Sequence, residues 1–138
     1  KAYPDMQEFV KNKNPNYIFA HYPTQSETNF LAEIGYCVSK DYQDKYWDFN
    51  NYLFTADKDF FLNKINADKI LERFNFDAKK INQCANSAET KNAVQNQVQE
   101  LKKTNLYGTP TIFINGKPFV GPKPYRVYRS AINKFIFF

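Results

Sequence analysis

The sequence predicts an α/β fold in which a block of helices interrupts a small β-sheet core. A compact β-prone run at 17–22 follows an amphipathic segment near the N-terminus, and a second β-rich region at 111–120 follows a long stretch with helical periodicity. The chain has 138 residues, which is long enough for one domain with its own hydrophobic core. Because its 43% hydrophobic residues include 14 Phe and 10 Tyr, we expect burial of large aromatic rings to drive folding.

The N-terminal part predicts a helix followed by a strand. Apolar residues recur at helical spacing within residues 2–12, which indicates a short amphipathic helix. A turn at Asn14-Pro15-Asn16 separates this helix from the run Tyr17-Ile18-Phe19-Ala20-His21-Tyr22. Since Pro23 ends the run, we expect residues 17–22 to form a central strand of the sheet.

The middle of the chain predicts a layer of helices. From Ser26 an apolar stripe at helical spacing runs through Cys37, and the aromatic-rich segment 43–54 is typical of a helix with a buried aromatic face. Further helices are expected to end near Phe74, Cys84 and Lys103. The side chains expected to cap the helix N-termini are Ser26, Asn66, Asp77 and Ser87.

The C-terminal part predicts a β-hairpin and a closing helix. Asn115-Gly116 lies between the apolar runs 111–114 and 117–120, and this pair favours the positive φ angles of a two-residue hairpin turn. Pro118 places the second run at a sheet edge, because proline cannot donate a ladder hydrogen bond. Pro124 can begin a helix whose apolar residues continue to Phe135.

The two cysteines, Cys37 and Cys84, are far apart in the sequence and form neither a Cys-x-x-Cys motif nor a metal-binding cluster. Both fall on the inward faces of predicted helices, so we expect a structural disulfide within or beside the helical layer. Two buried free thiols are the alternative. No metal ligand set and no cofactor motif is present in the sequence.

The formal charge of +5 favours acidic partners, but the lysines are scattered singly or in pairs along several segments. No basic arm, zinc spacing or RNA-binding motif accompanies them, so we expect no nucleic-acid partner. No apolar run approaches the roughly 20 residues that a membrane span requires. The first residues, Lys1-Ala2-Tyr3-Pro4, do not look like a secretory signal, so any targeting segment would lie upstream.

The most specific segment is Gly108-Thr109-Pro110-Thr111-Ile112-Phe113-Ile114-Asn115-Gly116-Lys117-Pro118-Phe119-Val120-Gly121. It resembles the cis-proline loop and last hairpin of the DsbA-like branch of the thioredoxin superfamily, and weaker similarities at 19–23 and 45–54 extend the resemblance along nearly the whole chain. The resemblance implies an N-terminally incomplete thioredoxin-like fold with a helical insertion. Its core would comprise residues 1–23 and 106–138, and the insertion residues 24–105.

One large departure from the family concerns its redox motif. Members carry a Cys-x-x-Cys pair at the start of the first long helix, whereas this chain begins there with Lys1-Ala2-Tyr3-Pro4. The resemblance places Lys1 directly after the position that the second cysteine of this motif occupies in the family. We therefore expect the active pair just upstream of Lys1, and no catalytic residue within the chain itself.

The resemblance also implies a function and its setting. It predicts a protein thiol–disulfide oxidoreductase that forms or exchanges disulfides in extracytoplasmic proteins, in the bacterial periplasm or an equivalent compartment, with an upstream segment as a possible anchor. Its partners would be reduced, unfolded or partly folded polypeptides and a membrane or soluble protein that reoxidises it. The alternatives are a redox-inactive peptide-binding module of the same fold and, with no residue to support it, a glutathione-using relative.

The resemblance assigns substrate binding to Thr109 and Pro110. The Thr109-Pro110 bond would be cis and lie against the active disulfide, and the Thr109 backbone would pair with an extended peptide. An ordinary trans turn is the alternative. His21, the single histidine, lies at the end of the expected strand and could tune a thiolate, although a hydrogen-bonded structural histidine is the common case at such a position.

Overall fold

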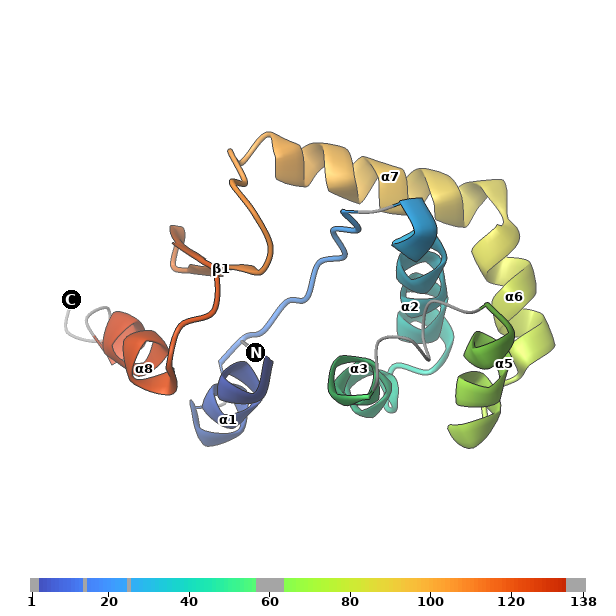
Figure 1. Ribbon diagram of the computed structural model, residues 1–138, viewed down its shortest axis with the longest axis horizontal. Coiled ribbons are helices and arrows are strands. Elements are labelled where there is room, and N and C mark those ends of the chain that lie inside the picture. The colour runs from blue at the N-terminus through green and yellow to red at the C-terminus, as the bar shows by residue number, and fades with distance from the viewer. Residues whose placement is uncertain (1–2, 14, 25, 57–63, 134–138) are drawn as a thin grey trace. The chain divides into compact units, whose positions relative to one another are not determined.

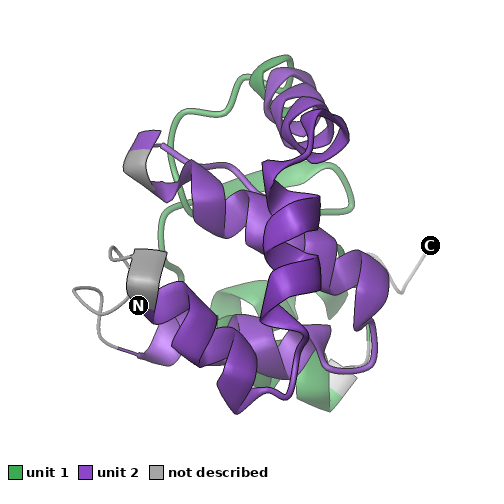
Figure 2. Ribbon diagram, turned by 90° about the vertical axis from the view of Figure 1, so that its right-hand side faces the viewer, with its two compact units in different colours: residues 1–20, 101–138 green, residues 21–100 purple. Residues whose placement is uncertain are grey.

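The computed structural model describes residues 3–13, 15–24, 26–56 and 64–133 (Figure 1). It divides the chain into two compact units, coloured separately in Figure 2. Unit 1 combines the two ends of the chain, residues 1–20 and 101–138, and unit 2 is the continuous segment 21–100. Each unit is described below by itself.

Unit 1 contains two helices and a β-hairpin. The helices are α1 (Tyr3–Lys13) and α8 (Tyr125–Asn133), and the hairpin consists of β1 (Thr111–Ile114) and β2 (Lys117–Val120) in antiparallel register. Asn115 and Gly116 have φ angles of 48° and 81°, and they form the two-residue turn. The sequence predicted both strands and this turn, because the Asn-Gly pair provides the positive φ angles that join twisted strands.

The core of unit 1 lies between the helices and one face of the hairpin. Alternation along the strands turns Ile112, Ile114 and Phe119 toward this core. Tyr128 of α8 is fully buried, and its ring contacts those of Phe9 and Phe119 at centroid distances of 6.4 Å. The remaining residues of this cluster are Met6, Val10, Tyr17, Tyr125, Ala131 and Ile132.

The prediction of a central strand at 17–22 is wrong for this structure. Residues 15–23 belong to no assigned strand, and the part of them in unit 1 is drawn as an extended trace in Figure 1. In the described part of the chain the sheet has two strands, β1 and β2. A β-prone run becomes a strand only when a neighbouring strand pairs with its backbone, and local sequence does not report that pairing. His21 therefore does not end a strand.

Unit 2 is helical. Its elements are the short 3-10 helix η1 (Ser26–Thr28) and the α-helices α2 (Asn29–Asp41), α3 (Tyr46–Thr55), α5 (Lys64–Arg73), α6 (Ala78–Asn86) and α7 (Ala88–Lys102), of which the last extends two residues into unit 1. The expected aromatic face of α3 is present, since Phe49 is buried and its ring packs edge-on against those of Phe74 and Phe76. The sequence thus predicted the helical character of this segment.

Two of the four expected N-terminal caps are observed. Asp77 Oδ1 accepts a hydrogen bond from Lys80 N at 2.9 Å, and Ser87 Oγ accepts one from Thr90 N at 3.2 Å. The other two predictions are wrong: Ser26 begins η1 instead of capping α2, and Asn66 lies inside α5, which begins at Lys64. An Asn or Ser side chain favours a cap locally, but tertiary packing decides where the helix begins.

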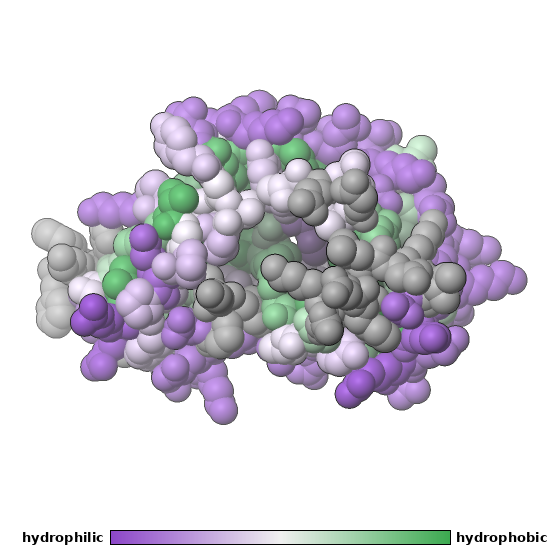
Figure 3. All heavy atoms as spheres, viewed as in Figure 1, coloured by the Kyte–Doolittle hydropathy of each residue, from purple (hydrophilic) through white to green (hydrophobic). Residues whose placement is uncertain are grey.

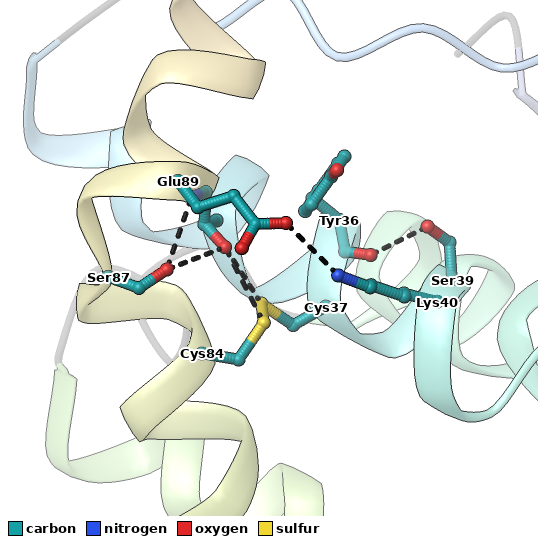
Figure 4. Close-up of polar contacts among 8 residues, drawn as sticks. Tyr36, Cys37, Ser39, Lys40, Cys84, Ser87 and Glu89 are labelled. Carbon is teal, nitrogen blue, oxygen red and sulfur yellow. Dashed lines mark hydrogen bonds and ion pairs between the residues drawn. A yellow bond between two sulfur atoms is a disulfide. The ribbon is translucent and has the colours of Figure 1, made fainter.

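Cys37 of α2 and Cys84 of α6 are joined by a disulfide, which Figure 4 shows between the two helices. Cys37 is completely buried and Cys84 is half-buried. The Thr90 hydroxyl lies 3.6 Å from Cys37 Sγ and 3.5 Å from Cys84 Sγ, and it also accepts a hydrogen bond from Ser87 Oγ at 3.2 Å. The start of α7 is thereby held against the cross-link.

The disulfide joins residues that are 47 positions apart, so its loss frees a long loop in the unfolded chain. We expect the variant C37A/C84A to lose about 4 kcal/mol of unfolding free energy in urea titrations, because the unfolded chain gains loop entropy. Dithiothreitol should destabilise the native protein by a similar amount and leave the double variant unchanged. Native protein whose stability does not respond to the reductant would contradict a structural role for the cross-link.

Candidate functional site

The Thr109-Pro110 loop connects α7 to β1 in unit 1. Its peptide bond is cis, and two hydrogen bonds hold the loop from either side. Thr111 Oγ1 donates to the Gly108 carbonyl at 2.6 Å, and Gly121 N donates to the Pro110 carbonyl at 2.8 Å. The second bond continues the hairpin ladder by one step beyond the Thr111–Val120 pair. The sheet edge thus positions the loop.

The outer side of the loop is open. Thr109 and Pro110 are both exposed, and the Tyr107 side chain just before them is 86% exposed. In the part of the chain that the structure describes, the Thr109 main chain has no hydrogen-bond partner. A main-chain donor and acceptor next to a sheet edge can pair with an extended peptide, as in β-strand addition. The Tyr107 ring offers such a peptide apolar contact area.

His21 lies in unit 2, whereas Thr109 and Pro110 lie in unit 1. Its backbone N–H donates to Gln97 Oε1 of α7 at 2.9 Å, and its Nε2 lies 3.4 Å from the Tyr46 hydroxyl of α3. The ring packs directly against Gly35 in the middle of α2. The single histidine is therefore held by contacts to α2, α3 and α7. These contacts are typical of a structural histidine, which the sequence offered as the alternative to a residue that tunes a thiolate.

Burial lowers the pKa of His21 to about 4, because the imidazolium form loses hydration inside unit 2. The ring is therefore neutral at physiological pH. A neutral imidazole can donate or accept a hydrogen bond, but it cannot stabilise a thiolate as a cation would. The interpretation of His21 as an electrostatic modulator gains no support from its surroundings.

Gly35 was not singled out from the sequence, although an isolated glycine inside a helical pattern is a signal for a packing constraint. A Cβ atom at this position would lie 2.5 Å from His21 Cε1 and 2.9 Å from His21 Nε2. Glycine in a helix interior costs roughly 1 kcal/mol relative to alanine. The close approach of the His21 ring to the backbone of α2 explains why glycine occupies position 35 despite this cost.

A metal site is not formed by the described residues, since no three His, Cys, Asp or Glu side chains gather there. Neither cysteine is free, because both belong to the disulfide between α2 and α6. Within the described ranges no helix is long and apolar enough to cross a membrane.

A family model described as thioredoxin matches residues 6–134, and the chain therefore belongs to the thioredoxin family. Among solved structures it is similar to that of a thioredoxin-like oxidoreductase from Silicibacter pomeroyi DSS-3. The TM-score is 0.83 at 17% sequence identity, over 98% of this chain and 77% of that chain. No curated protein matches the sequence. These findings confirm the expected superfamily and the thioredoxin-like fold.

Because the His21 ring lies so close to Gly35, replacing this helical glycine by alanine is predicted to destabilise the protein. Alanine for a helical glycine normally stabilises a protein, but we expect Gly35→Ala to lower the unfolding free energy by about 1–2 kcal/mol, because the new methyl group displaces the His21 ring. In the background of His21→Ala the same change should become neutral or stabilising. A double-mutant cycle by urea denaturation measures this coupling, and additive effects would contradict the contact.

The depressed pKa of His21 predicts a loss of stability in acid. In the unfolded state His21 binds a proton with a pKa near 6.5, whereas in the folded state its pKa is about 4. The contribution of neutral His21 to the unfolding free energy is therefore complete above pH 6.5 and is lost as the pH falls toward 4. We expect His21 to account for up to about 3 kcal/mol of this loss. Urea titrations of the native protein and of His21→Gln between these pH values measure it. Parallel pH profiles for the two proteins would contradict the assignment.

Proposed function

We propose that this chain forms the larger part of a protein thiol–disulfide oxidoreductase whose Cys-x-x-Cys pair directly precedes Lys1. The exposed Thr109-Pro110 loop, positioned by the hairpin edge with an unpartnered Thr109 main chain among the described residues, is the observation that supports this function most directly. Membership of the thioredoxin family over residues 6–134 supports redox chemistry as its general class.

The start of α1 suits the proposed cysteine pair. This helix begins at Tyr3 and extends for 11 residues, so a pair ending just before Lys1 would be next to its N-terminal turn. Unpaired N–H groups and the helix dipole at that end stabilise a thiolate and lower the pKa of the first cysteine. A lowered pKa makes that sulfur a good leaving group at neutral pH.

The reaction would proceed by two exchanges. A substrate thiolate attacks one sulfur of the enzyme disulfide, forming a mixed disulfide and releasing the other enzyme sulfur as a thiolate. A second substrate thiolate then attacks the substrate sulfur of the mixed disulfide, so that the substrate leaves oxidised and the enzyme is left as a dithiol. The Thr109 main chain would hold the substrate in an extended conformation during both steps.

The proposal includes an extracytoplasmic location and a separate protein that reoxidises the dithiol. The Cys37–Cys84 disulfide supports this location, because structural disulfides persist in oxidising compartments and are rare in the cytosol. The reduced enzyme needs an oxidant to act again. A membrane or soluble redox partner would remove its two electrons and two protons.

An oxidation assay with the intact native protein tests the proposed function. We expect it to form disulfides in a reduced, unfolded polypeptide, and replacement of the upstream cysteines by serine should abolish the activity. The matched control within this chain is C37S/C84S, which should retain most of the activity at a temperature where it remains folded, because that pair is structural. Intact protein that oxidises no substrate at any glutathione poise would refute the oxidoreductase proposal.

The second candidate is a redox-inactive peptide-binding module. One specific observation favours it: both cysteines within the chain form the disulfide of unit 2. The exposed Thr109-Pro110 loop would then bind a peptide without any exchange of disulfides. Peptide binding that survives replacement of every cysteine outside this pair, in a protein without oxidase activity, would favour the module.

A further inference from the structure

The two units carry opposite net charges. Unit 1 contains ten Lys or Arg and two Asp or Glu, whereas unit 2 contains nine and twelve. Unit 1 is therefore formally +8 and unit 2 −3. Most of this positive charge comes from the C-terminal segment 101–138, to which residues 1–20 add a net charge of only +1.

The positive charge is densest in the C-terminal part of unit 1. Residues 101–138 contain seven Lys or Arg and no acidic residue. Arg126 and Arg129 are exposed on α8 about one helical turn apart, whereas Tyr128 of the same helix is buried. Helix α8 begins four residues after Gly121, the residue that is hydrogen-bonded to the Pro110 carbonyl. Short connections thus join the arginines to the Thr109-Pro110 loop.

The same unit exposes large apolar side chains. Strand alternation turns Phe113 and Val120 away from the core of unit 1, and they are 43% and 40% exposed. Ile18 and Tyr107 are 81% and 86% exposed. Figure 3 shows hydrophobic residues reaching the surface of one face among hydrophilic ones. A partner suited to unit 1 must therefore supply both negative charge and apolar groups.

We propose that unit 1 selects acidic, unfolded polypeptides that carry aromatic or aliphatic residues among Asp and Glu. This inference rests on the proposed function, and it names the substrate class of the Thr109-Pro110 loop. The Thr109 main chain pairs with the extended segment, Tyr107 covers an apolar side chain, and the basic residues attract the acidic ones. A negatively charged chain is attracted by the net positive charge of unit 1.

Two fluorescent, cysteine-free peptides of equal length and with the same apolar residues test this inference. One carries Glu and the other Lys at the polar positions. In anisotropy titrations with the intact native protein at low salt, we expect the acidic peptide to bind at least about tenfold more tightly. About 0.5 M NaCl should remove most of this preference through screening. Equal binding of the two peptides, or a preference that salt does not reduce, would overturn the inference.

Charge-reversal variants identify the surface that causes the preference for the acidic peptide. The variant R126E/R129E should lose most of the preference for the acidic peptide, whereas K69E/K79E, which changes two exposed lysines of unit 2 by the same charge, should keep it. Circular dichroism establishes that both variants are folded. A preference that survives R126E/R129E would overturn the assignment to unit 1, and so would tight binding to anionic phospholipid vesicles that excludes the acidic peptide.

The peptides contain no cysteine, so their binding does not depend on the redox pair. If the intact protein has no oxidase activity but still prefers the acidic peptide, the proposed function fails and the charge selection stands. If the protein oxidises acidic and basic substrates at equal rates and binds both peptides equally, the charge selection fails and the oxidoreductase proposal stands.

Discussion

The packing of α1 and α8 on one face of the β1–β2 hairpin is the constraint on which unit 1 depends. Tyr128 is central to this packing, because its buried ring contacts residues of α1 and β2 while its hydroxyl accepts a hydrogen bond from Lys123 N at 3.2 Å. That bond fixes the chain just after Gly121, whose own N–H holds the Pro110 carbonyl. A buried aromatic residue thus determines, through two hydrogen bonds, where the open loop is presented.

In unit 2 the corresponding role belongs to α2. Cys37 of this helix is covalently joined to α6, and Gly35 accommodates the His21 ring, which also approaches Tyr46 of α3. The backbone N–H of the same histidine donates to Gln97 of α7. The cross-link and the histidine contact therefore connect the same helix to three others. These contacts add specific packing to the apolar core of unit 2, in which Val38, Leu71 and Ile81 are fully buried.

Features encoded by neighbouring residues could be predicted from the sequence. The hairpin follows from Asn115-Gly116, and the caps Asp77 and Ser87 satisfy backbone groups within one turn. The absence of strand pairing at 17–22 among the described residues could not be predicted, because pairing depends on a partner remote in sequence. The surroundings of His21 also remained unknown, since Gly35, Tyr46 and Gln97 approach it only after folding.

The Thr109-Pro110 loop could be predicted from the sequence in part. Its sequence identified it, but its exposure and its hydrogen bonds became known only from the structure. The positive charge of unit 1, in contrast, lies almost entirely in the continuous segment 101–138 and can be read from the sequence. The sequence therefore contains both the candidate binding residues and the basic segment, and the structure adds the exposure and the hydrogen bonds of the loop.

The central claim is that a redox-active cysteine pair lies at the start of α1. Mass-spectrometric sequencing of the intact native protein, reading the peptide immediately before Lys1, tests it most directly. The account predicts a Cys-x-x-Cys motif that ends at the residue before Lys1. A peptide without cysteines at that place would contradict the oxidoreductase account and leave the Thr109-Pro110 loop as a binding surface alone.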